Sequence, residues 1–200
     1  MANLTAPNGF VPMGIAGGIS PNYALENTAN ILIAKNDATK CFRGDPLKKL
    51  STGYLTQWTA GTSAALLAGV FWGCKYYSIS QNKIIWSKYW PGNDAASDVQ
   101  IEMIPIMGAV AQRFHVQSSA AAITFGNINN NIDVVLGTGN TLNQMSGASV
   151  DQTTINTTAT LPFKIVDLYS AFTPGVNGSD NTTSFNRVVV QANIAVTVGI

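Results

Sequence analysis

The chain has 200 residues, only 10% of them charged, and a formal net charge of +1, against about 25% charged residues in an average soluble protein. Its lysines and arginines are scattered along the sequence, so the basic surface that neutralising nucleic acid phosphates requires is not expected. No apolar run approaches the ~20 residues of a membrane-spanning helix, and the first residues lack the basic and apolar regions of an export signal.

Residues 1–26 form the first predicted element, an extended N-terminal arm. They contain three prolines and a single charged residue, and neither a regular helix nor a central strand fits this composition. A solvated, disordered tail is the alternative, but Leu4, Phe10, Val11 and Ile15 are too apolar for one. We therefore expect these four side chains to bind a surface, either on the chain's own domain or on a neighbouring molecule, and we take them as the candidate partner-binding residues of the arm.

Between residues 30 and 67 the sequence alternates short apolar runs with turn residues. Strands are predicted at 30–35, 39–43, 47–50 and 54–58, followed by a short helical turn at 62–67. The intervening segments at 36–37, 44–46 and 51–53 are built from Asn, Asp, Gly, Pro, Ser and Thr, which are typical of turns. Strands so closely spaced indicate a barrel or a sandwich rather than a parallel α/β sheet.

A β-hairpin is predicted at the centre of the chain. Runs rich in aromatic and β-branched residues at 70–79 and 83–90 flank a polar tetrapeptide at 80–83, in which Asn82 tolerates a positive φ. Pro91 and Gly92 then end the second strand, because proline cannot donate a hydrogen bond to a ladder.

Three of the four tryptophans, Trp72, Trp86 and Trp90, belong to this hairpin. If Trp86 and Trp90 share one strand, their spacing of four places them on the same face. We predict that the three form a buried structural core, because aromatic side chains dominate the energetics of small β cores. An exposed platform that stacks on sugar rings is the alternative.

The remaining strands are predicted at 99–106, 113–117, 122–125, 132–136, 163–169 and 187–198, with a long polar loop at 173–184. From residue 118 onward the composition shifts toward Ala, Asn, Thr and Gly. We therefore predict a mainly β protein, a compact antiparallel β-barrel or β-sandwich that carries the N-terminal arm. Its β domain covers residues 27–200, and position 118 is the one place where that domain would divide.

No group of residues shows a pattern for catalysis, metal binding or cofactor binding. The single histidine, His115, lies inside a predicted strand, where a structural role is expected. The two glycines at 137–139 begin like a dinucleotide-binding loop, but the third glycine of that fingerprint is missing. Cys41 and Cys74 are expected to be buried free thiols rather than a disulfide. We expect no enzyme activity, no metal and no cofactor.

Three blocks of sequence are similar to a known family. They are FRGDPLKKL at 42–50, AGVFWGCKY at 68–76 and WSKYWPG at 86–92, accompanied by the opening ANLTAPNGFVP and the closing VQAN at 190–193. In these blocks the chain resembles small virion structural proteins of tailed bacteriophages, which are encoded next to the major capsid protein and are regarded as capsid decoration, or cement, proteins. The resemblance covers the middle third of the chain and, more loosely, its ends.

The resemblance implies a non-enzymatic virion protein that is made in the host cytoplasm and located on the capsid surface. It would bind the outer face of an icosahedral shell, where it would bridge and stabilise subunits of the major capsid protein. Sister copies are a second expected partner, with a trimer favoured over a dimer, whereas nucleic acid and membranes are not expected partners. The alternative is a carbohydrate- or receptor-binding β module of a phage fibre or adhesin, which an exposed tryptophan pair would favour.

Overall fold

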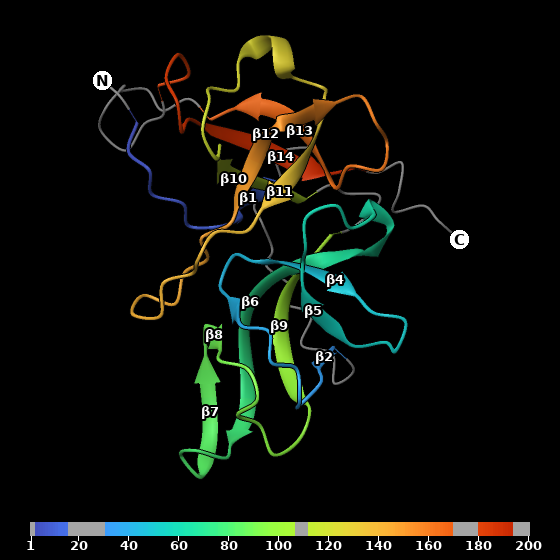
Figure 1. The fold of residues 1–200 in the computed structure, drawn as a ribbon, viewed down its shortest axis with the longest axis vertical. Helices are drawn as coiled ribbons and strands as arrows, with labels where there is room; N and C mark the ends of the chain where they lie inside the picture. Colours follow the sequence, from blue (N-terminus) through green and yellow to red (C-terminus); the bar gives the residue numbers. More distant parts are fainter. Residues whose placement is uncertain (1–2, 16–30, 107–111, 170–179, 194–200) are drawn as a thin grey trace.

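The computed structural model describes residues 3–15, 31–106, 112–169 and 180–193. Two six-stranded sheets stand one above the other, and a two-stranded pair lies beside the lower one (Figure 1). Of the described residues, 48% lie in strands and 4% in helices, so the fold is mainly β, as predicted, and the sheets are sandwich-like. The described residues do not form a closed barrel.

The upper sheet combines the N-terminal strand with the C-terminal part of the chain. Its strand order is β1-β10-β14-β13-β11-β12, and all neighbours are antiparallel. The strands are β1 (Val11–Ile15), β10 (Gln112–Gln117), β11 (Asn131–Val135), β12 (Ser149–Asn156), β13 (Phe163–Leu168) and β14 (Arg187–Ala192). β1 is therefore an edge strand, and it pairs with a strand about a hundred residues further along the chain.

The lower sheet is built from residues that are continuous in sequence. Its order is β2-β9-β6-β4-β5, and β7 also pairs with β6. The strands are β2 (Leu32–Ile33), β4 (Pro46–Lys49), β5 (Leu55–Gln57), β6 (Leu67–Ser78), β7 (Lys83–Ser87) and β9 (Val99–Pro105). β3 (Cys41–Phe42) pairs with β8 (Tyr89–Trp90). The short helices are η1 (Ala64–Leu66) and η2 (Phe125–Asn127).

β6 is the strand around which the lower sheet is arranged. It has twelve residues, and β9 covers one of its edges. Its other edge is shared by two strands. β4 pairs with the part of β6 that ends at Val70, and β7 pairs with the part that begins at Cys74. The inward side chains of β6 also divide: Leu67 and Val70 belong to one hydrophobic core, whereas Cys74 and its neighbours belong to another.

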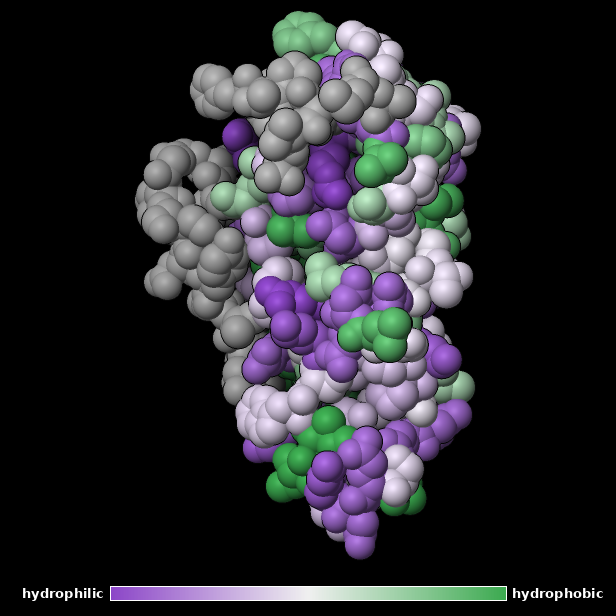
Figure 2. Space-filling view, turned by 90° about the vertical axis from the view of Figure 1, so that its left-hand side faces the viewer, coloured by the Kyte–Doolittle hydropathy of each residue, from purple (hydrophilic) through white to green (hydrophobic). Residues whose placement is uncertain are grey.

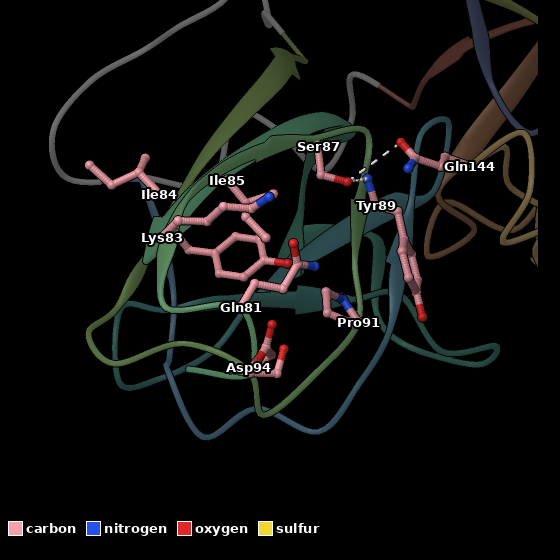
Figure 3. A pocket seen from close by; sticks show the side chains of 11 residues that line it. Gln81, Lys83, Ile84, Ile85, Ser87, Tyr89, Pro91, Asp94 and Gln144 are labelled. Carbon is pink, nitrogen blue, oxygen red and sulfur yellow. Dashed lines mark hydrogen bonds between the residues drawn. The ribbon is translucent and has the colours of Figure 1, made fainter. Parts of the chain in front are cut away.

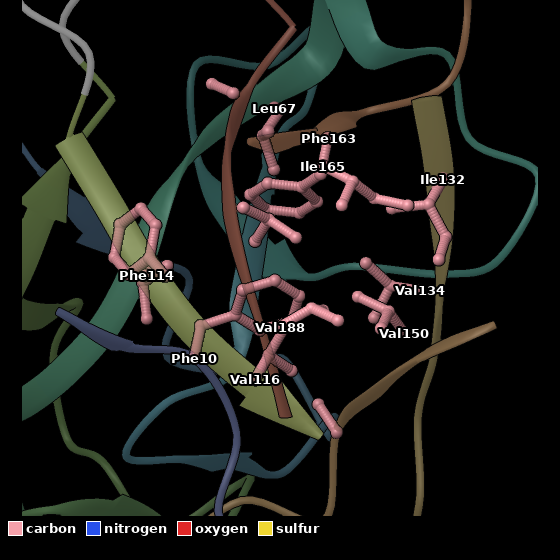
Figure 4. Close-up of a cluster of buried hydrophobic side chains, with 14 of the residues drawn as sticks. Phe10, Leu67, Phe114, Val116, Ile132, Val134, Val150, Phe163, Ile165 and Val188 are labelled. Carbon is pink, nitrogen blue, oxygen red and sulfur yellow. The ribbon is translucent and has the colours of Figure 1, made fainter. Parts of the chain in front are cut away.

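The larger core lies between the upper sheet and the upper end of β6 (Figure 4). Its centre is aromatic: the Phe10 ring stacks on Phe163 with 4.5 Å between centroids, and Phe114 meets both rings edge-on. Aliphatic side chains surround these rings, among them Leu67, Val70, Val116, Ile123, Ile132, Val134, Val150, Ile165, Val188 and Val190. β6 is therefore anchored in the upper half of the molecule as well as in the lower.

The turn at Phe42–Pro46 fills the gap between β4 and β7 on the edge of β6. The Gly44 amide donates to the Phe71 carbonyl at 2.8 Å, and the Phe71 amide donates to the Asp45 carbonyl at 2.8 Å. The Gly44 carbonyl accepts from the Phe10 amide at 2.9 Å. Gly44 has φ +98°, and a Cβ there would lie 2.9 Å from the Asn8 carbonyl oxygen, so this position requires glycine.

Asp45 is buried inside this turn, where its carboxylate accepts three hydrogen bonds. The donors are the Phe42 amide at 2.8 Å, the Gln57 Nε2 at 2.7 Å and the Ser146 hydroxyl. Ser146 belongs to the loop between β11 and β12, so the carboxylate joins the lower sheet to the upper one. Burial raises the pKa of Asp45 above its ordinary value, although these three hydrogen bonds act in the opposite direction.

Most of the predicted elements are present. The central hairpin is β6 and β7, and Asn82 in its turn has φ +52°, as predicted. Pro91 follows the end of β8, and the helical turn predicted at 62–67 is η1. β12 was not predicted, because its sequence SVDQTTIN is mostly polar.

The strand predicted at 122–125 is wrong. The Asn186 side chain occupies both backbone groups of Ile123: its Oδ1 accepts from the Ile123 amide at 2.9 Å, and its Nδ2 donates to the Ile123 carbonyl at 2.8 Å. Thr124 then caps η2 through a reciprocal contact with Asn127. A side chain thus provides the hydrogen bonds that a neighbouring strand would otherwise supply.

The described part of the predicted arm, residues 3–15, lies on the chain's own domain. Phe10 is 0% exposed in the larger core, and Val11–Ile15 form β1. Phe10 is therefore part of the fold, and its prediction as a partner-binding side chain is wrong, because no second molecule can reach it. Residues 16–26 of the predicted arm lie outside the described residues.

Replacement of Phe10 tests this placement. We expect Phe10→Ala to lower the free energy of unfolding by about 3–5 kcal/mol, since it leaves a cavity between two other phenylalanine rings. Leu4→Ala is the matched control, because Leu4 is 83% exposed, and it should change stability by less than about 0.5 kcal/mol. Urea unfolding followed by tryptophan fluorescence measures both values. Equal stability of the two variants would contradict the burial of Phe10.

Replacement of Asp45 tests the turn. Asp45→Ala leaves three donors without an acceptor, each at a cost of about 1–3 kcal/mol, so we expect a loss of at least about 3 kcal/mol. Asp45→Asn keeps an acceptor oxygen and should cost clearly less.

The pH dependence of the same two proteins provides a second measurement. Because the pKa of Asp45 is raised in the folded state, its contribution to stability is complete below the ordinary value of 3.8 and is lost as the pH rises through the raised pKa. The melting temperature of Asp45→Asn relative to the unchanged protein should therefore increase as the pH rises from this value toward neutrality. A constant difference between the two melting curves would contradict the raised pKa.

Candidate functional site

Exposed apolar side chains gather on the outer face of the β6–β7 hairpin. Lys75 pairs with Trp86, and Tyr77 pairs with Ile84. Because side chains alternate along a strand and paired residues share a face, these four side chains project from the same side of the sheet. The opposite side, with Cys74 and its neighbours, is the lower core.

Four of the ten exposed large apolar side chains of the described residues lie on this hairpin, so the exposure is concentrated there. They are Tyr77, Ile79, Ile84 and Trp86. In the space-filling view, apolar side chains gather at the lower end of the molecule, which the hairpin forms, next to hydrophilic residues (Figure 2). Contiguous exposed apolar surface of this kind marks an interaction site more often than single scattered residues do.

Cations lie over both of the tryptophans on this side. The Lys75 ammonium is 4.8 Å from the centre of the Trp86 ring, and the Arg43 guanidinium carbon is 3.6 Å from the centre of the Trp72 ring. Both rings line a shallow cleft of about 240 Å³, together with Lys88 and Glu102. Since Arg43 covers one face of Trp72, the cleft offers a single well-exposed tryptophan and not a pair.

The three predicted core tryptophans have different environments. Trp90 is 0% exposed in the lower core, as predicted. Trp72 is partly buried against the larger core. Trp86 is 60% exposed, so the prediction that it belongs to the core is wrong.

A break in the second strand of the hairpin explains the difference between Trp86 and Trp90. The Tyr89 amide donates to the Ser87 hydroxyl at 3.0 Å, and the Lys88 amide donates to Oε1 of Gln144 at 3.1 Å. These contacts separate β7 from β8, and β8 then pairs with β3 instead of β6. The two tryptophans therefore do not share a strand, and the predicted common face is lost.

A second concave surface, which we call the β7 groove, lies beside β7 (Figure 3). It has a volume of about 660 Å³, with Ile84 and Ile85 of β7 on one side and Tyr89 and Pro91 on the other. The residues that line it also include Tyr76, Ser80, Gln81, Lys83, Ser87, Asp94 and Gln144. The groove is thus lined by both apolar side chains and side chains that can form hydrogen bonds.

Tyr76 is the most buried side chain of the groove. It is 7% exposed and meets Trp90 edge-on, with 5.0 Å between ring centroids. Burial is the main cause that raises the pKa of Tyr76 to about 12, and neighbouring acidic groups act in the same direction. Its hydroxyl therefore remains protonated, yet no residue in the described ranges forms a hydrogen bond with it.

The other reactive groups are structural. Cys41 and Cys74 are buried free thiols, as predicted, and burial raises the pKa of Cys74 to about 12 and that of Cys41 well above its ordinary value. His115 stacks on Tyr169, and burial together with the charge of Arg187 lowers its pKa to about 4. The thiols are therefore protonated and the imidazole is neutral at neutral pH.

The remaining arm residues lie at the rim of the upper sheet. Leu4 is exposed, although its carbonyl accepts from the Gln117 Nε2 at 2.8 Å. Val11 is half-buried and pairs with His115, and the backbone of Ile15 pairs with Gln112. Of the four predicted arm residues, Leu4 is the one whose described side chain is well exposed.

The part of the chain that the structure describes contains no group of three or more potential metal-binding side chains. None of its helices is long and apolar enough to cross a membrane. No protein-family model, curated protein or solved structure matches this chain. The resemblance to capsid decoration proteins therefore stays a prediction.

Trp86 in β7 and Trp90 in β8 provide a matched test of the strand break between them. Trp90→Ala should lower the free energy of unfolding by about 3–5 kcal/mol, because it empties a site in the lower core. Trp86→Ala should cost no more than about 1 kcal/mol, the size of an exposed cation–π contact. Denaturant unfolding of both variants measures the difference, and similar losses would mean that both rings are buried.

Proposed function

We propose that this protein is a non-enzymatic virion structural protein that binds the outer face of an icosahedral phage capsid, where it bridges and stabilises major capsid protein subunits. The observation that carries the proposal is the exposed apolar face of the β6–β7 hairpin, with Tyr77, Ile84 and Trp86 on two paired strands. Such a face binds a protein surface at a low entropic cost, because both strands are already ordered. The WSKYWPG block, on which the resemblance rests, includes part of this hairpin.

The charge of the chain supports the same function. With 10% charged residues and a net charge of +1, neighbouring copies repel each other weakly and can pack closely on a shell. Sister copies are therefore proposed as a second partner, with a trimer favoured over a dimer. Many identical sites on one shell also increase the effective affinity once neighbouring copies touch.

A binding experiment on capsids tests the proposal. Purified protein is added to undecorated capsids of the phage that encodes it, and occupancy is measured by electron microscopy and by co-sedimentation. Trp86→Glu should reduce occupancy at least tenfold, because it places a charge in the apolar contact, while the melting temperature of the free protein remains nearly unchanged.

Phe125→Glu is the matched control. Phe125 is also exposed and apolar, but it lies in η2, at the opposite end of the molecule from the hairpin (Figure 1). This variant should bind capsids like the unchanged protein. The proposal fails if the unchanged protein does not coat capsids, or if both variants bind equally well.

A carbohydrate- or receptor-binding module is the second candidate function. The observation in its favour is the cleft of about 240 Å³, in which the exposed Trp86 ring lies near Lys88 and Glu102. Against it, Arg43 covers the Trp72 ring, so there is no open tryptophan pair. Glycan-array binding that Trp86→Ala abolishes, combined with unaltered capsid occupancy of that variant, would favour this function over the first.

A further inference from the structure

We propose that the β7 groove is a strand-addition site, in which an extended segment of another protein, apolar at its centre and acidic at its ends, pairs with the free edge of β7 and accepts a hydrogen bond from Tyr76. This site adjoins the outer face that carries the proposed function and shares Ile84 with it. The groove would bind such a segment whether or not the protein is part of a capsid.

The edge of β7 is the first observation. Among the described residues β7 pairs only with β6, and no backbone hydrogen bond joins it to residues 89–94 across the groove. Ile84 and Ile85 point to opposite faces of the strand, yet both line the groove. The groove therefore borders the backbone edge itself, where unpaired amide and carbonyl groups form a template for an additional strand.

The Tyr76 hydroxyl is the second observation, and it is independent of the first. A phenol that is 93% buried normally has a hydrogen-bond partner, but no described residue provides one here. The hydroxyl is a donor that opens onto the groove, so it is available to an acceptor of a bound molecule. The main-chain carbonyl groups of an extended segment in the groove can serve as that acceptor.

The charges at the two ends of β7 determine the kind of segment. Lys83 begins the strand and lines the groove, and Lys88 follows the last residue of the strand and lines the neighbouring cleft beside Trp86, so an exposed cation lies at each end of β7. The one carboxylate that lines the groove, Asp94, lies outside β7 and already accepts from the Ser78 hydroxyl at 2.6 Å and the Ser80 amide at 2.9 Å. Acidic residues at both ends of an incoming segment therefore complement β7.

The same charges disfavour a second copy of this chain as the occupant. If two β7 strands paired antiparallel over the whole segment 83–88, Lys83 of each copy would face Lys88 of the other. Like charges directly opposite each other destabilise a strand pair. Lysine at an exposed edge is also a common feature that prevents such self-pairing.

A peptide titration tests the proposal. The probe is the blocked hexapeptide Glu-Val-Thr-Val-Thr-Glu, and the control has Lys at both ends. Amide chemical shifts of the labelled full-length protein are recorded by NMR, which detects weak binding as well. We expect the acidic peptide to shift the amides of β7 and of Tyr89, and to bind at least tenfold more tightly than the basic control.

Two matched variants separate specific binding from loss of structure. Tyr76→Phe should weaken peptide binding by about 3–10-fold, the value of one hydrogen bond, without loss of stability, since the hydroxyl has no partner within the described part of the chain. Tyr54→Phe, the same change at a tyrosine that does not line the groove, should leave the affinity unchanged. Lys83→Glu should shift the preference toward the peptide with basic ends.

N-methylation of the peptide backbone distinguishes strand addition from simple occupation of the groove. Methyl groups on one alternate set of amides should abolish binding, whereas those on the other set, which point away from β7, should be tolerated. Equal effects of the two sets, shifts that lie outside the groove, or no binding would overturn the proposal. Displacement by the peptide of a dimer seen in sedimentation would also overturn it, because the occupant would then be a second copy.

Discussion

The buried carboxylate of Asp45 is the constraint on which the arrangement of the two sheets depends. Its three donors come from the turn itself, from the end of β5 and from the loop between β11 and β12. The backbone of the same turn bonds to Phe10 and to Phe71. Because all of these groups are fixed by one short turn, a shift of the carboxylate would disturb the N-terminal segment, β6 and the upper sheet together.

Burial of a carboxylate costs free energy, because its charged form loses solvation by water. This cost explains why hydrogen-bond donors surround Asp45 closely. The pKa of Asp45 is raised because its charged form is poorly solvated, so the carboxylate is tolerated only while its donors remain in position. Glycine at position 44 permits the tight approach of the N-terminal segment, as its φ and the nearby Asn8 carbonyl require. The turn therefore favours one relative position of the sheets over others.

This turn explains why two different strands, β4 and β7, pair with the same edge of β6. Where the turn occupies the edge of β6, neither β4 nor β7 can pair with it. On its other side, β7 has no partner strand among the described residues. The apolar outer face and the groove therefore belong to a hairpin that projects from a well-fixed centre. Such a hairpin is suitable for a binding surface, since its strands are already ordered and binding costs little conformational entropy.

Local sequence patterns predicted the fold class and the central hairpin. Alternation and Asn82 defined the central hairpin, and the punctuated strands defined the mainly β class. The exposure of Trp86 was not predictable, because the strand break before Trp90 depends on Gln144, which is 56 residues away from Lys88. The burial of Phe10 likewise depends on Phe114 and Phe163, which no local pattern connects to it.

The candidate site was only partly visible in the sequence. Trp86 was recognised as a binding candidate, but only in the alternative interpretation. The signal that was overlooked is the run KIIWSK at 83–88, in which lysines flank an apolar strand, a pattern typical of a protected edge. The groove itself could not be predicted, since its far wall results from the separation of β8 from β7.

The pairing of β1 with β10 has a consequence for synthesis on the ribosome. Residues 31–106 complete the lower sheet, but β1 has no partner until β10 emerges about a hundred residues later, which takes roughly 5–20 s at usual elongation rates. During this interval the Phe10 ring and the Leu67 end of β6 lack their apolar neighbours from the upper sheet. The nascent chain therefore carries an unpaired strand and an open core, the two features that favour aggregation, until its last strands are translated.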